Sequence, residues 1–500
     1  MSATAASNQV VPDRRTRLVI LGICSMSLLI VGLDSTIVNV ALPAIHRSFH
    51  SALSGLQWTI DAYTLVIASL LMLSGSTADR LGRRRVFQCG LALFALGSLL
   101  CALAPNLATL IAARILQAIG ASMLNPVAMS IIRNVFEDPR ERAQAVGVWG
   151  ALMGISMALG PVVGGALVDS VGWRAVFIVN VPIGLVAILL TALFVPESRA
   201  AHPRRIDPVG QTLVIVALAT LTYAIIQGPE AGWLSAQTLT LSVVSLAAFA
   251  SLVAYELRRR EPLLEIRFFR SAPFSGATAT AVAMFMAMGG FLFLNTLYLQ
   301  NVRHLSPLEA GLYTLPMAGV MMVVAPISGR IVGSFGTRWP LVGGSLAVTA
   351  SAVMLTRLTG HTSFDYLVTA YALFGLGMGL VNPPITNTAI SGMPPSQAGV
   401  AAAVASTGRQ VGVTLGVAVM GSLAAGGIVA IGPGFTAATH ASWWIMAGLG
   451  VMTLVLGFVT TSAWGLATAG RVADEFRDID GPADGSPAAR RDDPARVLAG

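Results

Sequence analysis

The chain has 500 residues, of which 55% are hydrophobic and only 11% are charged, and its formal net charge is +8 at pH 7. An ordinary soluble domain has about 25% charged residues, so the composition excludes that class and favours an all-α membrane protein. The positive charge does not indicate a nucleic-acid partner. The arginines lie in short polar breaks between apolar runs, where anionic lipid headgroups explain them better.

Apolar windows separated by polar breaks predict fourteen transmembrane helices. Each window can cross the roughly 30 Å of bilayer hydrocarbon as a helix. The first window runs to about Leu42, too long for the apolar region of a signal peptide, so we expect an uncleaved first span. The predicted spans are 18–42, 56–78, 86–104, 107–131, 143–167, 173–195, 209–227, 236–257, 275–300, 311–333, 339–358, 364–390, 398–430 and 441–465.

The arginines predict the orientation of these spans. With the N-terminus inside, 25 of the 31 basic residues fall in inside segments and four in outside segments, while Arg114 and Arg409 lie within spans. Positive residues concentrate on the cytoplasmic side of membrane proteins. We therefore expect a multi-pass protein of the cell membrane with both termini in the cytoplasm.

An internal repeat predicts two halves. The segment "GSTADRLGRRR" (75–85) aligns with "GRIVGSFGTRW" (329–339) at an offset of 254 residues, and "MLNP" (123–126) aligns with "LVNP" (380–383) at 257. Such halves usually place a substrate site between them and alternate access to it. The predicted organisation is a cytoplasmic N-terminus 1–17, a six-helix bundle 18–195, two inserted helices with cytoplasmic linkers 196–274, a six-helix bundle 275–465 and a disordered cytoplasmic tail 466–500.

The short loop between spans 2 and 3 is a candidate conformational latch. Its glycines allow tight turns, and Asp79 can pair with nearby arginines or cap the next helix. A solvated basic loop is the alternative interpretation. The predicted latch residues are Gly75, Asp79, Arg80, Gly82, Arg83 and Arg84.

Small residues in span 5 predict close helix packing. Gly160 and Gly164 lie four residues apart, followed by Gly165, and Pro161 removes a backbone hydrogen bond. Packing alone would explain this pattern. A functional interpretation is that close packing of this helix prevents a leak of protons or solute.

Asp34 is a formal charge inside the first span. It lies roughly 12 Å from the outer end, and Arg114 in span 4 lies roughly 10 Å deep, given a rise of about 1.5 Å per residue. Asp61 in span 2 lies at a similar depth. Charges inside spans are usually paired and functional. We assign Asp34, Arg114 and Asp61 to proton coupling; a permanent Asp34–Arg114 ion pair that never titrates is the alternative.

Further polar residues within the spans are candidates for a substrate cavity. Arg409 could meet an anionic substrate, a cluster of carbonyl groups or Asp61, or it could be bonded structurally. The predicted cavity residues are Asn39, Gln117, Asn125, Asn295, Asn382 and Arg409.

The sequence does not favour an intramembrane enzyme or a receptor. The six histidines are scattered in or beside predicted loops, and the three cysteines show no metal-ligand spacing. We therefore expect no metal site, no catalytic triad and no cofactor. The loops are too short for a ligand-binding or signalling domain.

Several segments together resemble the major facilitator superfamily, and within it the fourteen-span drug:proton antiporters. The segments are "LDSTIVNVALP" (33–43), "GSTADRLGRRR" (75–85), "RILQAIGAS" (114–122), "GPVVGG" (160–165), "WRAVFIVNVPIG" (173–184), "LSPLEAGLYTLP" (305–316) and "TGRQVGVTLG" (407–416). The resemblance implies a fold of two six-helix bundles plus two inserted helices. It also links Asp34 and Arg114 to proton coupling, Asp79 and Arg83 to the latch, and the span 5 glycines to the antiporter helix.

These observations predict a secondary exporter of amphipathic small molecules, driven by the proton gradient through alternating access. The alternative is a dedicated exporter of one endogenous metabolite, lipid or amino acid, which the motifs do not exclude. We expect small-molecule substrates, protons and the lipid bilayer as partners, and a monomer, because nothing in the sequence requires a second copy.

Overall fold

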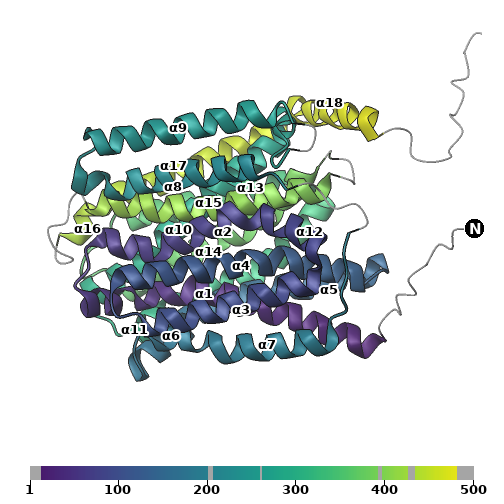
Figure 1. Ribbon diagram of the computed structural model, residues 1–500. Helices are drawn as coiled ribbons and strands as arrows, with labels where there is room; N and C mark the ends of the chain where they lie inside the picture. Colours follow the sequence, from purple (N-terminus) through teal and green to yellow (C-terminus); the bar gives the residue numbers. More distant parts are fainter. Residues whose placement is uncertain are drawn as a thin grey trace, which may run out of the picture.

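The computed structural model describes residues 13–200, 206–259, 262–391, 393, 397–425 and 434–480, and all regular structure within these ranges is helical (Figure 1). The helices are α1 (Arg14–Phe49), α2 (Leu53–Leu81), α3 (Arg83–Leu103), α4 (Leu107–Val135), α5 (Pro139–Ser170), α6 (Ala175–Ile178), α7 (Asn180–Phe194), α8 (Pro208–Ala231), α9 (Ala236–Glu256), η1 (Ile266–Arg270), α10 (Ala272–Leu297), η2 (Tyr298–Val302), α11 (Pro307–Tyr313), α12 (Leu315–Phe335), α13 (Arg338–Leu355), α14 (Phe364–Ile390), α15 (Ala398–Ala425), α16 (Phe435–Ala438), α17 (His440–Thr460) and α18 (Ala463–Asp480).

The long helices run along one common direction and form a single elongated bundle (Figure 1). Twelve helical segments of the described chain are long and apolar enough to cross a membrane. Two further helices, α13 and α15, coincide with the predicted spans 339–358 and 398–430 but do not belong to that set. The length and apolarity of the described helices therefore confirm a polytopic helical protein, and they do not confirm the predicted number of fourteen spans.

Two sets of six long helices pack with the same pattern of neighbours. In the first set α1 packs against α5, α2 against α4, and α3 against α4 and α7. In the second set α10 packs against α15, α12 against α14, and α13 against α14 and α17. The order along the chain is the same in both sets, so the packing repeats as the sequence does.

The helices α8 and α9 lie between the two sets in sequence and form a separate pair. α8 packs against α2 and α15, one helix from each set, and α9 packs against α8 at the edge of the bundle (Figure 1). Two polar contacts fix α8 on α2: Gln211 Nε2 donates to the Ser69 carbonyl at 2.6 Å, and Ser54 Oγ donates to Glu230 Oε1 at 2.7 Å. The inserted pair therefore covers the seam between α2 and α15.

Side chains at helix starts explain several of the boundaries. Asp207 caps α8 by accepting from the backbone N–H of Gly210 at 3.0 Å, and Pro208 follows it as the first helical residue. Ser306 and Glu309 form a capping box at α11, again with a proline next. Such caps satisfy backbone donors that have no partner within the helix, and proline is tolerated there because it lacks one.

Two aligned glycines end aligned helices. Gly82 follows α2 with φ +112°, and Gly336 follows α12 with φ +81°. These backbone angles favour glycine because a Cβ atom would be strained. The surroundings differ: a Cβ on Gly82 would lie 2.5 Å from Glu197 Oε1, whereas a Cβ on Gly336 would meet nothing within 4 Å.

The prediction of a disordered tail from residue 466 is wrong for residues 466–480, which belong to α18. Val472 and Phe476 are buried, and the Phe476 ring lies 5.2 Å from the Phe268 ring in η1. The tail has few apolar residues, but Val472 and Phe476 lie one turn apart on one face of the helix, and that face packs against the linker before α10. The remaining tail, 481–500, lies outside the described residues.

We expect Gly82→Ala to destabilise the protein more than the matched variant Gly336→Ala. Both changes strain a left-handed backbone, at roughly 1–2 kcal/mol, but only Gly82→Ala also displaces the Glu197 carboxylate. Thermal unfolding of the purified protein in detergent measures the difference. Equal losses in the two variants would exclude the carboxylate as the cause.

Candidate functional site

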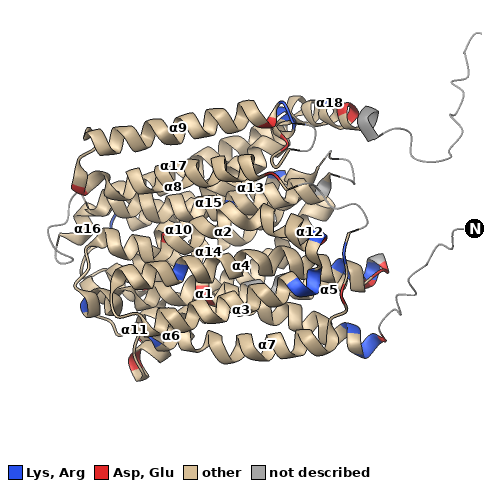
Figure 2. Ribbon diagram, in the orientation of Figure 1, with Lys and Arg blue, Asp and Glu red and all other residues tan. Residues whose placement is uncertain are grey.

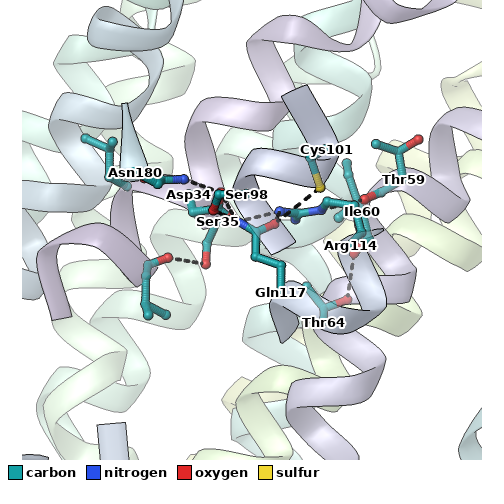
Figure 3. Close-up of polar contacts among 12 residues, drawn as sticks. Asp34, Ser35, Thr59, Ile60, Thr64, Ser98, Cys101, Arg114, Gln117 and Asn180 are labelled. Carbon is teal, nitrogen blue, oxygen red and sulfur yellow. Dashed lines mark hydrogen bonds and ion pairs between the residues drawn. The ribbon is translucent and has the colours of Figure 1, made fainter. Parts of the chain in front are cut away.

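The candidate site is a hydrogen-bonded charge network around Asp34 in the interior of the first helix set (Figure 3). Asp34 Oδ2 accepts from Arg114 Nη1 at 2.6 Å. Asp34 Oδ1 accepts from Gln117 Nε2 at 2.8 Å and from Asn180 Nδ2 at 2.9 Å. These four side chains are at most 1% exposed. The predicted pair of Asp34 and Arg114 therefore exists, and two amides complete the shell of the carboxylate.

Arg114 is held on several sides. Its Nη1 also donates to Gln117 Oε1 at 2.6 Å, and its Nε donates to the Thr59 carbonyl at 3.2 Å. The guanidinium carbon lies 4.0 Å from the centroid of the Tyr63 ring. A buried ion pair offsets its desolvation only when further hydrogen bonds satisfy both partners, and an aromatic face adds to the stabilisation of the cation.

Two members of the network were not predicted. Asn180 lies at the start of α7, and Ser98 in α3 accepts from Gln117 Nε2 at 2.8 Å. Asn180 carries a usable signal, because it is an amide inside the apolar stretch "FIVNVPIG". Ser98 carries none, since serine is a common packing residue in membrane helices.

Asp61 does not join this network. It is fully buried in α2, and among the described residues neither of its carboxylate oxygens has a hydrogen-bond partner. It forms no ion pair with Arg114 or Arg409. Asp34, Arg114 and Asp61 were predicted at a similar depth, but only Asp34 and Arg114 interact.

Three predicted cavity residues are buried and bonded within the protein. Gln117 belongs to the Asp34 network, and Asn39 Nδ2 donates to the Ser35 carbonyl one turn earlier in α1 at 3.3 Å. Asn295 in α10 accepts a short hydrogen bond from the Tyr371 hydroxyl. In this conformation their polar groups serve packing between and within helices.

The other three predicted cavity residues are less enclosed. Asn125 in α4 is half-buried and its Oδ1 has no partner in the described chain, while Asn382 in α14 is exposed. Arg409 in α15 is half-buried and its Nη2 donates to Thr386 Oγ1 at 2.5 Å. Of these three residues only Asn382 is exposed, whereas the atoms Asn125 Oδ1 and Arg409 Nε are buried.

The predicted latch residues bond to their own helix set. Asp79 Oδ1 accepts from Arg83 Nη2 at 3.0 Å, and Arg84 Nη2 donates to the Ala192 carbonyl at 2.8 Å. Gly75 lies where α2 passes Pro126 of α4, and Arg80 is exposed in the last turn of α2. The Asp79–Arg83 contact therefore joins the end of α2 to the start of α3, and the Arg84 contact holds the start of α3 against the end of α7.

Glu197 completes this arrangement and was not predicted. It lies beyond α7, and its Oε1 accepts from the backbone N–H of Arg84 at 3.2 Å, while its Oε2 lies 3.6 Å from Arg85 Nε. A carboxylate at a helix N-terminus is stabilised by the unpaired N–H groups there. Glu197 therefore caps α3, and Gly82 leaves room for it.

The small residues of α5 pack directly beside Asp34. A Cβ on Gly160 would collide with Thr36, and a Cβ on Gly164 would lie 2.6 Å from Ile37 Cγ1. Thr36 and Ile37 follow Asp34 by two and three residues in α1. The glycines thus allow the close packing that the sequence predicted for this helix, and the structure shows that the partner is α1 next to the charge network.

The same stretch of α5 also contacts the second helix set. A Cβ on Gly165 would lie 2.5 Å from Leu308 Cα in α11, and a Cβ on Gly311 would collide with the Pro161 carbonyl. Asp169 Oδ2 accepts from the backbone N–H of Leu308 at 3.0 Å. α5 therefore joins the helix that carries Asp34 to the opposite half.

The second set has an aromatic cluster where the first has charges. The repeat offset of 257 residues in span 4 relates Arg114 to Tyr371 and Gln117 to Phe374, and Phe291 of α10 packs against both rings. The Phe291 ring lies 5.3 Å from the Tyr371 ring and 4.5 Å from the Phe374 ring. The contacts between helices repeat, but the charges do not.

The two sets close against each other at the bundle end far from the described termini. Among the described residues, hydrogen bonds between the sets run from Gln57 to the carbonyls of Val417 and Ala418, from Gln300 to the Val40 carbonyl, from Leu308 to Asp169, and between Thr414 and Thr64. All lie between the middle of the bundle and that end.

Comparisons with known proteins agree with this architecture. Residues 24–417 match the model of the Major Facilitator Superfamily. The Multidrug resistance protein Stp of Mycobacterium tuberculosis is 38% identical over 411 residues, which cover 82% of this chain and 76% of that protein. The Tetracenomycin C resistance and export protein of Streptomyces glaucescens is 37% identical, covering 80% of this chain and 74% of that protein.

A solved structure shares the fold. The crystal structure of a bacterial homolog of the human lysosomal transporter Spinster, inward-facing and unoccupied, superposes with a TM-score of 0.64. It covers 93% of this chain and 99% of that chain at 18% sequence identity.

We expect Arg114→Met to destabilise the protein by about 3–5 kcal/mol, because it leaves the buried Asp34 without its cation. The double variant Asp34→Asn/Arg114→Met removes both charges and should recover part of that loss. Thermal unfolding measures both, with Arg330→Met, at an exposed position near the end of α12, as the control. A double variant less stable than Arg114→Met alone would contradict a compensating pair.

We expect Gly164→Ala to lower the free energy of unfolding by about 1–3 kcal/mol, since one methyl group overpacks the contact between α5 and α1. Gly154→Ala on the same helix is the matched control, because a Cβ there meets nothing within 4 Å. Thermal unfolding compares the two. Destabilisation of the same size in Gly154→Ala would show that the α1 contact is not the reason.

Proposed function

The chain belongs to the major facilitator superfamily, and from this premise we propose that it exports amphipathic small molecules across the cell membrane in exchange for protons. It is a multi-pass membrane protein and a transporter rather than an enzyme. The observation that carries the proposal is Asp34, a fully buried carboxylate held by a cation and two amides inside an apolar bundle. Charges in such positions are costly and usually functional.

A proton on Asp34 would change the network directly. The ionised carboxylate accepts from three donors, whereas the protonated acid gives up its charge interaction with Arg114 and offers one O–H donor. The guanidinium would then need new partners, since an unpaired buried charge is unfavourable. We propose that this exchange of partners is the step at which proton binding alters helix packing.

Contacts lead from Asp34 to the opposite half of the molecule. Thr36 and Ile37 follow Asp34 in α1 and pack on the α5 glycines, and the same stretch of α5 contacts Leu308 in α11. A shift of α1 relative to α5 would therefore strain the contact that closes the two halves. Coupling through packed elements requires a two-state element, and we propose that the closure between α5 and α11 is that element.

Asp61 is proposed as a second proton-binding carboxyl. It is buried and, in the described chain, without a hydrogen-bond partner. An ionised carboxylate in this environment is far more costly than the neutral acid. Its separation from the Asp34 network suggests that the two groups bind protons at different steps.

We propose that α13 and α15 also cross the membrane, which gives fourteen spans with both termini in the cytoplasm. Most basic residues lie at the bundle end that holds the N-terminus (Figure 2), as expected for a cytoplasmic surface. The closed end is then external, and this conformation faces inward. In this assignment 18–195 and 275–465 form the two bundles, 196–274 holds the inserted pair, and the latch at Asp79 and Arg83 lies on the cytoplasmic side.

The names of the relatives leave two candidates for the range of substrates: many compounds or one. One relative is named for multidrug resistance and another for tetracenomycin C alone. The first name favours export of varied amphipathic compounds, which we propose as the main function; the second favours a dedicated exporter of one compound as the alternative. In both cases we propose a monomer that uses the proton gradient as its energy source and needs no cofactor.

We expect efflux of Nile red, an uncharged amphipathic dye, from whole cells to depend on the proton gradient, and Asp34→Asn to reduce it to the level seen without a gradient. The amide cannot release a proton but keeps the size of the side chain. Asp365→Asn, at an exposed carboxylate in the first turn of α14, is the matched control. Full gradient-driven efflux by Asp34→Asn would make Asp34 structural, and an inactive wild type would favour the dedicated exporter.

A further inference from the structure

We propose that Arg409 and Thr386 form a subsite for the anionic group of an amphipathic solute, so that the transporter prefers anions to cations. The inference rests on the proposed export function and specifies its substrate class. It starts from a cation that the charge network around Asp34 does not use.

Arg409 lies deep within the bundle. It is the twelfth residue of α15, so its Cα is roughly 16 Å from the start of a helix that rises about 1.5 Å per residue. Its Nη2 donates to Thr386 Oγ1 of α14, and its guanidinium carbon lies 5.7 Å from the Phe285 ring of α10. Its Nε is buried and has no hydrogen-bond partner in the described chain.

No carboxylate of the described residues forms an ion pair with Arg409. The other buried arginine, Arg114, pairs with Asp34 at 2.6 Å. The hydrogen bond between Thr64 and Thr414 shows why Asp61 does not neutralise Arg409. Asp61 lies three residues from Thr64 toward the closed end, and Arg409 lies five residues from Thr414 toward the other end, so roughly 12 Å separate their levels.

The surroundings of Arg409 are more typical of a solute-binding site than of a packed protein core. Arg409 and Thr386 are half-buried, and Asn382, one turn before Thr386 in α14, is exposed. Polar residues inside membrane spans face the bundle interior or a wet cavity rather than lipid. Arg409, Thr386 and Asn382 therefore form a polar strip. This strip lies farther from the closed end than the hydrogen bonds that join the two halves.

The chemistry of the strip selects an anion. A guanidinium presents its N–H groups as a planar fork that matches a carboxylate, sulfonate or phosphate. The Phe285 ring beside it offers apolar surface for the rest of an amphipathic molecule. A fixed, unpaired cation also repels cationic solutes, which contributes to specificity as much as the attraction does.

The test compares two probes with the same fluorophore and opposite charge. Dansylglycine (an anion) and dansyl-ethylenediamine (a cation) are titrated against the purified protein in phosphatidylcholine nanodiscs, with empty nanodiscs as the blank. We expect wild type to bind dansylglycine about tenfold or more tightly than the cation, as a charge-assisted contact gives. Arg409→Gln should abolish this preference and Arg409→Lys should keep part of it.

A matched control and a lipid arm complete the design. Arg330→Gln removes one positive charge at an exposed position and should leave the preference unchanged. Nanodiscs that also contain phosphatidylglycerol test whether an anionic lipid headgroup occupies the subsite. Wild type without a preference for the anion, Arg409→Gln with the preference intact, or loss of dansylglycine binding in the anionic nanodiscs would each overturn the proposal.

Failure of this inference is separable from failure of the proposed function. Binding of the probes needs no proton gradient, and efflux of the uncharged dye Nile red does not need a preference for anions. A charge preference that depends on Arg409, found in a protein without gradient-driven efflux, would support the subsite and overturn proton-coupled export.

Discussion

The ion pair between Asp34 and Arg114 is the constraint that organises the first helix bundle. A carboxylate and a guanidinium deep in an apolar bundle need each other and further hydrogen bonds to offset their desolvation. Gln117 on α4, Ser98 on α3 and Asn180 at the start of α7 supply these bonds, so four helices must meet at one level. The glycines of α5 then let a fifth helix pack beside Asp34, and that helix touches the opposite half through Leu308.

The two halves share packing but divide the chemistry. Where the first half holds Asp34, Arg114 and Gln117, the second holds the rings of Phe291, Tyr371 and Phe374. An aromatic cluster is stabilised by contact area and ring geometry. Proton coupling is therefore proposed for the first half, and a role in substrate selection is proposed for Arg409 of the second half, which forms no ion pair among the described residues.

Sequence reasoning predicted what depends on composition, helix rise and turn chemistry. It predicted the positions of the long helices, the pairing of Asp34 with Arg114, and the turn glycine Gly82. Depth along a helix follows from a fixed rise per residue, and a positive φ follows from the needs of a tight turn. Helix rise and turn conformation are local properties, and they stay the same when the helices assemble into the bundle.

The remaining features depend on how each helix is rotated about its axis. Asp61 has the right depth to meet Arg114, but among the described residues it forms no hydrogen bond or ion pair with it, and depth alone could not show this. Glu197 caps α3 only because the chain after α7 returns to Gly82, a tertiary contact that no local pattern encodes. The helix α18 was missed because few apolar residues in a charged tail suffice when they share one face.

The most direct test of the central claim is proton release on substrate binding. Nile red, an uncharged amphipathic dye, is added to the purified transporter in weakly buffered solution, and the pH change is recorded for wild type, Asp34→Asn and Asp61→Asn. If Asp34 exchanges its proton as its contact with Arg114 changes, wild type releases protons and Asp34→Asn binds the dye with less release. Equal release from wild type and Asp34→Asn would contradict the account and leave Asp34 a structural partner of Arg114.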